Sequence, residues 1–181
     1  NSSNAYFRSK GLAEEFVKNS GLAASIIRTP ILLGPNTAGA SSMIGAAKQT
    51  KTKILGGGKY SMRPLDIDDL NQAILNCCNS DSLEAKLYEL VGPEPISYRD
   101  LIQKTAAMMN NSVEIGSVPV AIAKLVAAIS SRIKGGGITP TVIDVITMDE
   151  VVNKNADGEL NITLTPLQNT LEKILEHKKN K

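Results

Sequence analysis

Residues that commonly hold metals are scarce in this 181-residue sequence. It contains two cysteines, Cys77 and Cys78, and one histidine, His177. Neighbouring residues on a helix point about 100° apart, so two adjacent cysteines neither bridge easily nor form a metal site alone. With a single histidine besides, a zinc cluster has almost no ligands, and we predict no metal site. We interpret the cysteines as reduced, buried thiols of a cytoplasmic protein.

The sequence also lacks a marked charge excess and a long apolar run. Its 20 basic and 18 acidic residues leave a net charge of +2, which gives no reason to expect binding to nucleic acid or an acidic membrane. The longest apolar stretch, VPVAIAKLVAAI, is too short to span a membrane, and no signal peptide is visible. The missing initial methionine indicates a processed chain or a fragment. The composition, 42% hydrophobic, suits one globular domain, or one domain plus part of another.

The first predicted element is a helix over residues 4–19. Ser2, Ser3 or Asn4 can cap it, because a short polar side chain accepts hydrogen bonds from the first free backbone N–H groups. Gly21 follows, where glycine readily takes the left-handed conformation that ends helices.

A nearly continuous apolar run from Ile26 to Leu33 comes next. It predicts a strand buried on both faces, as in a parallel sheet covered by helices, and Gly34-Pro35-Asn36 ends it. Residues 37–50 are small and weakly helical. KILGGGKY is predicted to be a flexible turn. A phosphate cradle there would need a strand-to-helix context followed by lysine and a hydroxyl residue, so we prefer a mobile turn.

The middle of the chain alternates strand and helix. SMRPLDIDDLNQAILNCC predicts an extended piece and a helix that Asp68 or Asp69 can cap. KLYELVG and VEIGSVP predict strands, and between them a helix opens at Ser97, with Asp100 completing a near-capping box. This order is typical of a parallel α/β unit.

Helices dominate the remainder of the sequence. PVAIAKLVAAISSRI and TPTVIDVITMDEVV predict two helices on either side of a glycine-rich turn at residues 135–137. Thr165 is expected to cap a last helix and Pro166 to take its first position.

Tyr6 and Lys10 lie four residues apart in the first helix, and therefore on one face of it. An ammonium group beneath a tyrosine lowers the pKa of the phenol, and a tyrosine so tuned can exchange a proton with a substrate near neutral pH. The same lysine can hydrogen-bond a ribose. Taken alone, the spacing favours a surface tyrosine and a solvated lysine over a catalytic pair.

The wider sequence resembles the extended and atypical branches of the short-chain dehydrogenase/reductase superfamily. The resemblance rests on YFRSKGLAEEFVKNSGLAASIIRTPILLGP, MRPLDIDDLNQAI, LYELVGPEPISYRDLI and LTPLQNTLEKIL, in that order. It is similar above all to nucleoside-diphosphate-sugar epimerase-like proteins and to the nucleotide-binding accessory subunit of respiratory complex I. It implies the C-terminal part of a Rossmann-type doubly wound α/β fold (1–36) followed by a small, mostly helical substrate region (37–181).

The resemblance also implies roles for particular residues. Tyr6 would be the catalytic acid/base, and Lys10 would assist it and hold the nicotinamide ribose of NAD or NADP. Pro30, Ile31 and Leu32 would lie against the nicotinamide.

Two further residues are implied in the substrate pocket. Tyr60 and Arg63 would face the substrate, and the arginine could pair with a phosphate. A plain surface arginine is an equal alternative for Arg63. Helix capping is preferred over a functional role for Asp68 and Asp69.

Parts of the family pattern are missing or changed. The glycine-rich dinucleotide turn and the usual catalytic serine or threonine would lie upstream of residue 1, so we interpret the chain as the C-terminal half of a longer protein. The bare strand edges that remain predict a missing N-terminal partner or self-association. Ile31 and Asp66 replace residues common in sugar-nucleotide epimerases, which leaves quinone, isoprenoid or steroid substrates, or purely structural nucleotide binding, open.

Two hypotheses follow. The first is an NAD(P)-dependent oxidoreductase or epimerase/dehydratase-like enzyme in which Tyr6 transfers a proton alongside hydride transfer. The second is a non-catalytic nucleotide-binding or assembly subunit. On either hypothesis, we expect the 181-residue chain by itself to be inactive.

Overall fold

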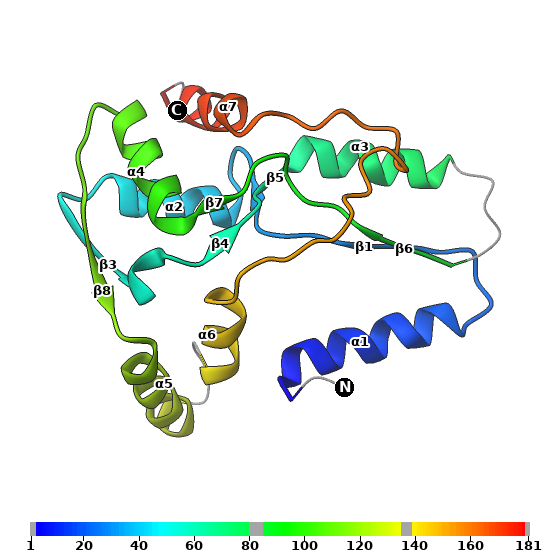
Figure 1. Ribbon diagram of the computed structural model, residues 1–181, viewed down its shortest axis with the longest axis horizontal. Coiled ribbons are helices and arrows are strands. Elements are labelled where there is room, and N and C mark those ends of the chain that lie inside the picture. The colour runs from blue at the N-terminus through cyan, green and yellow to red at the C-terminus, as the bar shows by residue number, and fades with distance from the viewer. Residues whose placement is uncertain (1–2, 80–84, 135–138, 180–181) are drawn as a thin grey trace.

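The computed structural model describes residues 3–79, 85–134 and 139–179 (Figure 1). The elements alternate between helices and short strands, as the fold-class prediction requires. In chain order they are α1 (Ala5–Lys18), β1 (Ser25–Arg28), β2 (Leu32–Leu33), α2 (Ala38–Ala47), β3 (Lys51–Leu55), the 3-10 turn η1 (Gly56–Gly58), β4 (Ser61–Met62), β5 (Leu65–Asp66), α3 (Ile67–Cys78), β6 (Lys86–Glu89), β7 (Ile96–Ser97), α4 (Tyr98–Met108), β8 (Glu114–Val118), α5 (Val120–Lys134), α6 (Pro140–Ile146) and α7 (Leu167–Lys179).

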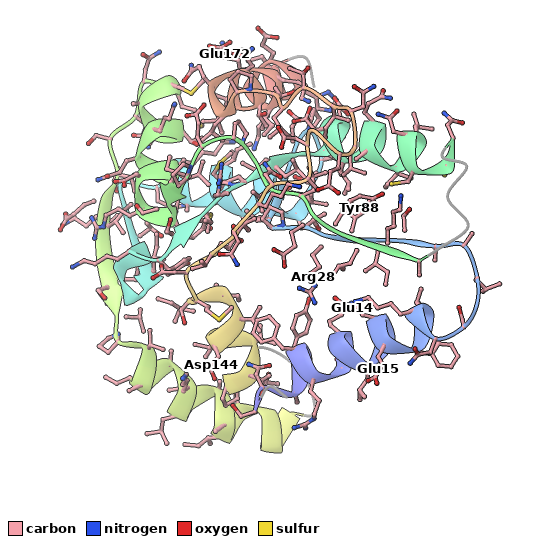
Figure 2. The ribbon with its side chains drawn as sticks, turned by 45° about the vertical axis from the view of Figure 1, so that its right-hand side comes forward. Glu14, Glu15, Arg28, Tyr88, Asp144 and Glu172 are labelled. Atoms are coloured by element: carbon pink, nitrogen blue, oxygen red, sulfur yellow. The ribbon has the colours of Figure 1, made fainter. Side chains whose placement is uncertain are left out.

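The strands form four pairs rather than one wide sheet. β1 pairs with β6, β2 with β5 and β3 with β8, all parallel, whereas β4 and β7 are antiparallel. The predicted strand–helix–strand unit is therefore present along the chain, but its two strands, β6 and β8, belong to different pairs. In both views α3 lies along one side of the β1–β6 pair and α1 along the other, so this region has three layers, helix, strands and helix (Figures 1 and 2).

Most of the core lies between α2, α4 and α7. Its largest cluster joins β2, α2, β4, α4 and α7, which contribute Leu33, Ala40, Met43, Ile44, Tyr60, Met62, Leu101, Leu167, Leu171 and Ile174. A second cluster lies between the β3–β8 pair and α4, and a third between β5, α3 and the chain at residues 156–160. Most of the core therefore lies away from α1, in which no residue is buried.

Local signals at helix ends predicted several boundaries correctly. Asn4 caps α1, and Gly21 has a φ of 73°, as expected for a left-handed stop. Ser97 caps α4 by accepting a hydrogen bond from the N–H of Asp100 at 3.0 Å. These signals act within a few residues, and so do not depend on the rest of the fold.

Two predicted helix starts are wrong by one to three residues. Asp66, rather than Asp68 or Asp69, caps α3, because its side chain accepts from the N–H of Asp68 at 2.9 Å. The last helix begins at Leu167, after Pro166. The Thr165 hydroxyl donates to Asp69 at 2.7 Å, and the N–H of Leu167 donates to Glu94 at 3.4 Å. Asp68, Asp69 and Thr165 form hydrogen bonds with residues far away in the sequence instead of capping a helix.

Two strand predictions and one burial prediction need correction. Lys53, Ile54 and Leu55, expected to be part of a flexible turn, belong to β3, because residues 51–55 pair along their whole length with β8. The apolar run breaks into β1 and β2, and Ile26 and Ile27 are only half-buried. Cys78 is exposed, contrary to the expectation of two buried thiols. The predicted turn at 135–137 lies outside the described residues.

Candidate functional site

The N-terminal turn of α1 carries the predicted acid–base pair. The Asn4 side-chain oxygen accepts from the backbone N–H groups of Tyr6 at 2.9 Å and Phe7 at 3.4 Å, and its amide donates to the carbonyl of Thr141 at 3.3 Å. The start of the helix is therefore capped and joined to α6. The Lys10 Nζ lies 5.8 Å from the centroid of the Tyr6 ring, within the range of a cation–π contact. The structure thus brings the two side chains together.

α1 is held against β1 by a cluster of three charged residues. Arg28 on β1 donates from Nε and Nη2 to the two carboxylate oxygens of Glu14, at 2.8 and 2.6 Å, and from Nη1 to Glu89 on β6 at 2.9 Å. Figure 2 shows Glu14 and Arg28 pointing toward each other across the gap between helix and strand. Tyr6, Lys10 and Glu14 follow one another at four-residue intervals, so this ion pair turns their side of α1 toward β1.

The same cluster changes the protonation equilibria of its members. The hydrogen bond from Arg28 holds the pKa of the Glu14 carboxyl below its ordinary value of 4.5, against an opposing effect of burial. The pKa of Arg28 is raised, chiefly by the hydrogen bond to Glu14. Both groups therefore stay charged at neutral pH, and the bidentate geometry fixes their relative orientation.

The predicted nicotinamide contacts lie just beyond the carboxyl end of β1. Pro30, Ile31 and Leu32 are half-buried, and Ile31 packs against the largest core cluster. The carbonyl of Ile31 accepts from the N–H of Leu65 at 3.1 Å, which continues the pairing of β2 and β5. The N-terminal end of α1 and the carboxyl end of β1 lie toward the same side of the molecule (Figure 1). Ligands of parallel α/β sheets bind at such carboxyl ends.

Tyr60, predicted to face substrate, lies in the core. It is 8% exposed and stacks on Tyr98, with ring centroids 5.8 Å apart and an angle of 18° between the rings. Burial, with a smaller effect of Tyr98, raises the pKa of Tyr60 to about 12. Its phenol is therefore protonated at neutral pH, and little of its surface is open to a ligand.

Arg63, also predicted to face substrate, is half-buried and contacts protein carbonyls. Its guanidinium donates from Nε to Gly92 at 3.0 Å and from Nη2 to Pro93 at 2.7 Å. Its backbone N–H donates to Glu150 at 2.7 Å, and burial raises the pKa of that carboxyl. A Cβ on Gly92 would lie 1.8 Å from the carbonyl oxygen of Pro64, so the two chain segments meet backbone to backbone. Arg63 thus joins the 92–93 loop to β4.

The glycine turn is ordered by an arginine that sequence reasoning did not single out. Gly56, Gly57 and Gly58 have φ values of 57°, 69° and 69°, a region that side chains disfavour. Arg99 donates from Nε to the Gly57 carbonyl at 3.0 Å and from Nη2 to the Ile115 carbonyl at 2.8 Å. The glycines are thus required by backbone conformation and by the close approach of Arg99, and the turn takes the 3-10 form η1 with a hydrogen bond from Arg99.

Asp66, at a position where the family pattern differs, belongs to a buried polar network. Its carboxylate is 2% exposed and accepts from the Thr170 hydroxyl at 2.7 Å and from Lys173 Nζ at 2.6 and 2.8 Å. Asp68 also accepts from Lys173, at 2.8 Å. The pKa of Lys173 is raised by hydrogen bonds to these two carboxylates, although burial, the largest single effect, opposes the rise. The network fastens α7 to the start of α3.

Two surface hollows lie elsewhere on the described part of the chain. One is lined by Asn76, Cys77, Asn79, Tyr88, Glu159, Leu160 and Asn161, and the other lies between α4 and α7. Within residues 3–79, 85–134 and 139–179, no group of three or more His, Cys, Asp or Glu side chains is placed to hold a metal ion. No helix in the same ranges has the length and apolarity needed to cross a bilayer.

The cluster of Glu14, Arg28 and Glu89 is not foreseen in the sequence. Glu14 and Glu89 are separated from Arg28 by 14 and 61 residues, so no local spacing indicates that they meet. An arginine ending an apolar strand was the one available signal, because a charged group at that place needs a partner.

Comparisons with known proteins support the fold. No protein-family model and no curated protein matches the sequence. Among solved structures, a functionally unknown conserved protein from Silicibacter pomeroyi matches 97% of this chain and 57% of its own, with a TM-score of 0.70 and 17% identity. The dTDP-4-dehydrorhamnose reductase from Bacillus anthracis, solved with NADP, matches 94% and 54%, with a TM-score of 0.63 and 17% identity.

A third solved structure, MoeE5 with UDP-glucose and NAD, matches 95% of this chain and 53% of its own, with a TM-score of 0.64 and 15% identity. The chain therefore spans about half the length of the solved structures that it matches. At these identities the likeness shows the fold alone, which corresponds to about half of these Rossmann-type structures.

Proposed function

We propose that this chain supplies the acid–base helix of an NAD(P)-dependent oxidoreductase or nucleotide-sugar epimerase/dehydratase-like protein. The contact of Lys10 with Tyr6, on the helix that Glu14 and Arg28 join to β1, is the observation that supports this function. In the proposal, residues 1–36 end a nucleotide-binding domain and residues 37–181 form a substrate-binding region. The dinucleotide-binding turn belongs to another stretch of polypeptide.

That polypeptide would pair with β1. Among the residues that the structure describes, β1 has one strand partner, β6, and its second edge is unpaired. An unpaired edge of a parallel strand offers backbone donors and acceptors to a further strand. We propose that a strand of the missing nucleotide-binding half completes the sheet here.

The residues present fit the nicotinamide end of NAD or NADP. Lys10 offers an ammonium donor for a ribose hydroxyl, and Pro30 and Ile31 offer half-buried apolar surface for the ring. The sequence contains no glycine-rich turn of the kind that holds the pyrophosphate. When bound, the nicotinamide would give or accept a hydride.

The chain's own residues would handle the proton. Tyr6 would donate a proton from its hydroxyl to a substrate oxygen in reduction, or take one in oxidation. The positive charge of Lys10 and the N-terminal end of α1 would stabilise the phenolate that forms. The Glu14–Arg28 pair would position the helix. Because Tyr6 is 45% exposed, the proposed nucleotide-binding half would also exclude water from the site.

One observation favours a second candidate, a non-catalytic nucleotide-binding or assembly subunit. The two residues that the resemblance placed in the substrate pocket, Tyr60 and Arg63, contact the protein's own core and carbonyls. A protein that turns over no substrate needs no polar groups facing one. The experiment must therefore measure cofactor binding and turnover separately.

The test uses the protein extended by whatever residues precede Asn1 in its gene. We expect NADH or NADPH binding, and turnover with a panel of sugar-nucleotide, quinone, isoprenoid and steroid substrates. Tyr6→Phe should lower kcat by about 10²–10⁴-fold and leave cofactor binding intact, because it removes only the transferable proton. Tyr88→Phe, on β6, is the matched control. Cofactor binding without turnover, unchanged by Tyr6→Phe, would establish the non-catalytic candidate instead.

The 181-residue chain alone tests whether the dinucleotide-binding turn lies outside it. We expect titration with NADPH to show no tight binding, because the pyrophosphate has no helix N-terminus with a glycine turn to hold it. Saturation at low micromolar NADPH would contradict the proposal that another stretch of polypeptide carries this turn.

A further inference from the structure

The hollow between α4 and α7, called here the α4–α7 hollow, has the size of a small-molecule site. Its volume is about 460 Å³, and such sites range from about 300 to 1,000 Å³. α4 and α7 lie on the side of the molecule opposite α1 (Figures 1 and 2). A ligand in this hollow would therefore be separate from the proposed substrate, and its binding would not depend on the proposed function.

The deeper part of the α4–α7 hollow is apolar. Met108 and Met109 at the end of α4, together with Leu175 of α7, are half-buried and pack against the largest core cluster. The charged residues that complete the lining are all exposed. Because methionine side chains are unbranched and flexible, they adapt to apolar ligands of different shapes. The hollow thus offers an apolar floor under a charged rim, which suits an amphiphile better than a fully polar molecule.

Two lysines of this rim lie next to each other. Lys48 follows the last residue of α2, and Lys178 belongs to the last turn of α7. The pKa of Lys178 is lowered by slight burial and then by the charge and the contact of Lys48. Each helix end favours one lysine by itself, because cations suit the C-terminus of a helix. The contact of two like charges is unfavourable, however, unless an anion binds both.

Neither of these two lysines has an acidic partner within the part of the chain that the structure describes. Four other lysines form ion pairs with carboxylates there, namely Lys51, Lys124, Lys154 and Lys173. The ammonium groups of Lys48 and Lys178 are therefore available to a ligand.

The acidic residues of the rim limit where a ligand can carry negative charge. Glu172 lies six residues before Lys178, about 9 Å along α7, and accepts from Gln168 at 2.8 Å. Three lysines and two glutamates line the hollow, so its net charge is +1 (Lys48, Lys178, Lys179, Glu172 and Glu176). A ligand with negative charge along its whole length would be repelled by Glu172, whereas a ligand with one anionic head at Lys48 and Lys178 would not.

We propose that the α4–α7 hollow binds a single-chain amphiphile with an anionic head. The head, a carboxylate or a phosphate, lies between Lys48 and Lys178 and forms a charge-assisted hydrogen bond with each. The chain lies over Met108, Met109 and Leu175, and so covers apolar surface that is partly exposed in the free protein.

Titration of the isotope-labelled 181-residue chain, followed by NMR, tests the proposal. We expect saturable binding of decanoate and decyl phosphate, with the largest shifts at Met108, Met109 and Leu175, and the tighter of the two ligands identifies the head group. Octanoate should bind about tenfold more weakly than decanoate, because each CH₂ group taken out of water changes the affinity about fourfold. Decyltrimethylammonium, which has the same chain and a cationic head, should bind at least about tenfold more weakly than decanoate.

Lysine variants separate contacts with the head from a general effect of charge. Lys48→Gln and Lys178→Gln should each weaken decanoate binding about three- to fivefold, the upper range for an exposed ion pair. Lys51→Gln is the matched control, because it removes an exposed lysine that pairs with Glu114 on β8, and it should leave decanoate binding unchanged. Lys48→Gln should also raise the melting temperature of the ligand-free chain slightly, because it removes a contact of like charges. Circular dichroism checks that each variant is folded.

The absence of saturable decanoate binding would overturn the proposal. So would equal affinities for octanoate and decanoate, or decanoate binding that is unchanged in the Lys48→Gln/Lys178→Gln double variant. Binding of inorganic phosphate as tight as that of decyl phosphate would mean an adventitious ion only. Binding of the chain to phosphatidylglycerol vesicles, lost in the double variant and without binding of decanoate, would assign the two lysines to a membrane surface instead.

Discussion

Helices α4 and α7 on one side of the molecule and α1 on the other all carry apolar residues, but only α4 and α7 bury them. α4 buries Leu101, Ile102, Thr105 and Ala106 against α2 and the β3–β8 pair, whereas α1 buries none of its residues. Leu171 of α7 is 0% exposed and Leu12 of α1 is 62% exposed, although both lie inside helices. An apolar residue on a helix therefore stabilises the fold only where another element covers it. The packed side carries the core, and the open side carries Tyr6 and Lys10.

The largest expected effect comes from truncating a leucine on each side. Leu101→Ala should lower the free energy of unfolding by about 2–5 kcal/mol, because it leaves a cavity in a fully buried position. Leu12→Ala should change it by less than about 0.5 kcal/mol. Urea denaturation of both variants measures the difference. Equal losses would show that α1 is covered in solution and would contradict the claim that only the packed side buries its apolar residues.

The polar network on the packed side should give the next largest effect. Asp66→Asn removes the charge that Lys173 and Thr170 contact, and we expect a loss of about 1–3 kcal/mol in unfolding free energy. Asp68→Asn is the control, because that carboxylate is 67% exposed and its pair with Lys173 is worth less than about 1 kcal/mol. Similar losses in the two variants would mean that burial of Asp66 has no bearing on its contribution.

Adding a methyl group to one glycine on each side, Gly11 of α1 and Gly92 of the packed side, should change stability in opposite directions. Gly11 lies inside α1, and a Cβ added there would have nothing within 4 Å, so Gly11→Ala should stabilise the chain by about 0.5–1 kcal/mol through helix propensity. Gly92→Ala should be strongly destabilising, because its Cβ would overlap the Pro64 carbonyl. Thermal unfolding followed by circular dichroism reports both. A loss of stability in Gly11→Ala would show that something packs on that turn of α1.

The smallest expected effect is a pH dependence on the open side. The pKa of Glu14 is lowered in the folded chain, so its pairing with Arg28 stabilises the fold above the ordinary glutamate pKa of 4.5 and is lost as the pH falls through the lower folded value. Because Arg28 is half-exposed, the contribution should be below about 1 kcal/mol.

Glu14→Gln should therefore flatten the pH dependence of the unfolding free energy between about pH 5 and pH 3. Glu15→Gln, at the exposed neighbouring position, serves as the control. An identical slope in the wild type and Glu14→Gln would mean that the ion pair does not hold α1 against β1.

Local patterns predicted elements better than they predicted burial. The caps at Asn4 and Ser97 were predictable because they involve side chains and backbone groups only two or three residues apart. β3 was missed because KTKIL has two lysines and precedes three glycines, and it becomes a strand only through pairing with β8, about 60 residues away. The bond of Thr165 to Asp69 likewise joins residues 96 positions apart, so no local pattern predicts it.

In the candidate site, too, local spacing was predictable and contacts between distant residues were not. The sequence by itself determined that Tyr6 and Lys10 share one side of a helix, because a four-residue spacing and the helical repeat suffice for that. Only the tertiary structure decided that Glu14 and Arg28 turn this side toward β1, and that Tyr60 and Arg63 contact the protein itself. Spacing along a helix is a local property of the backbone, whereas contacts across the fold depend on which distant surfaces exclude water together.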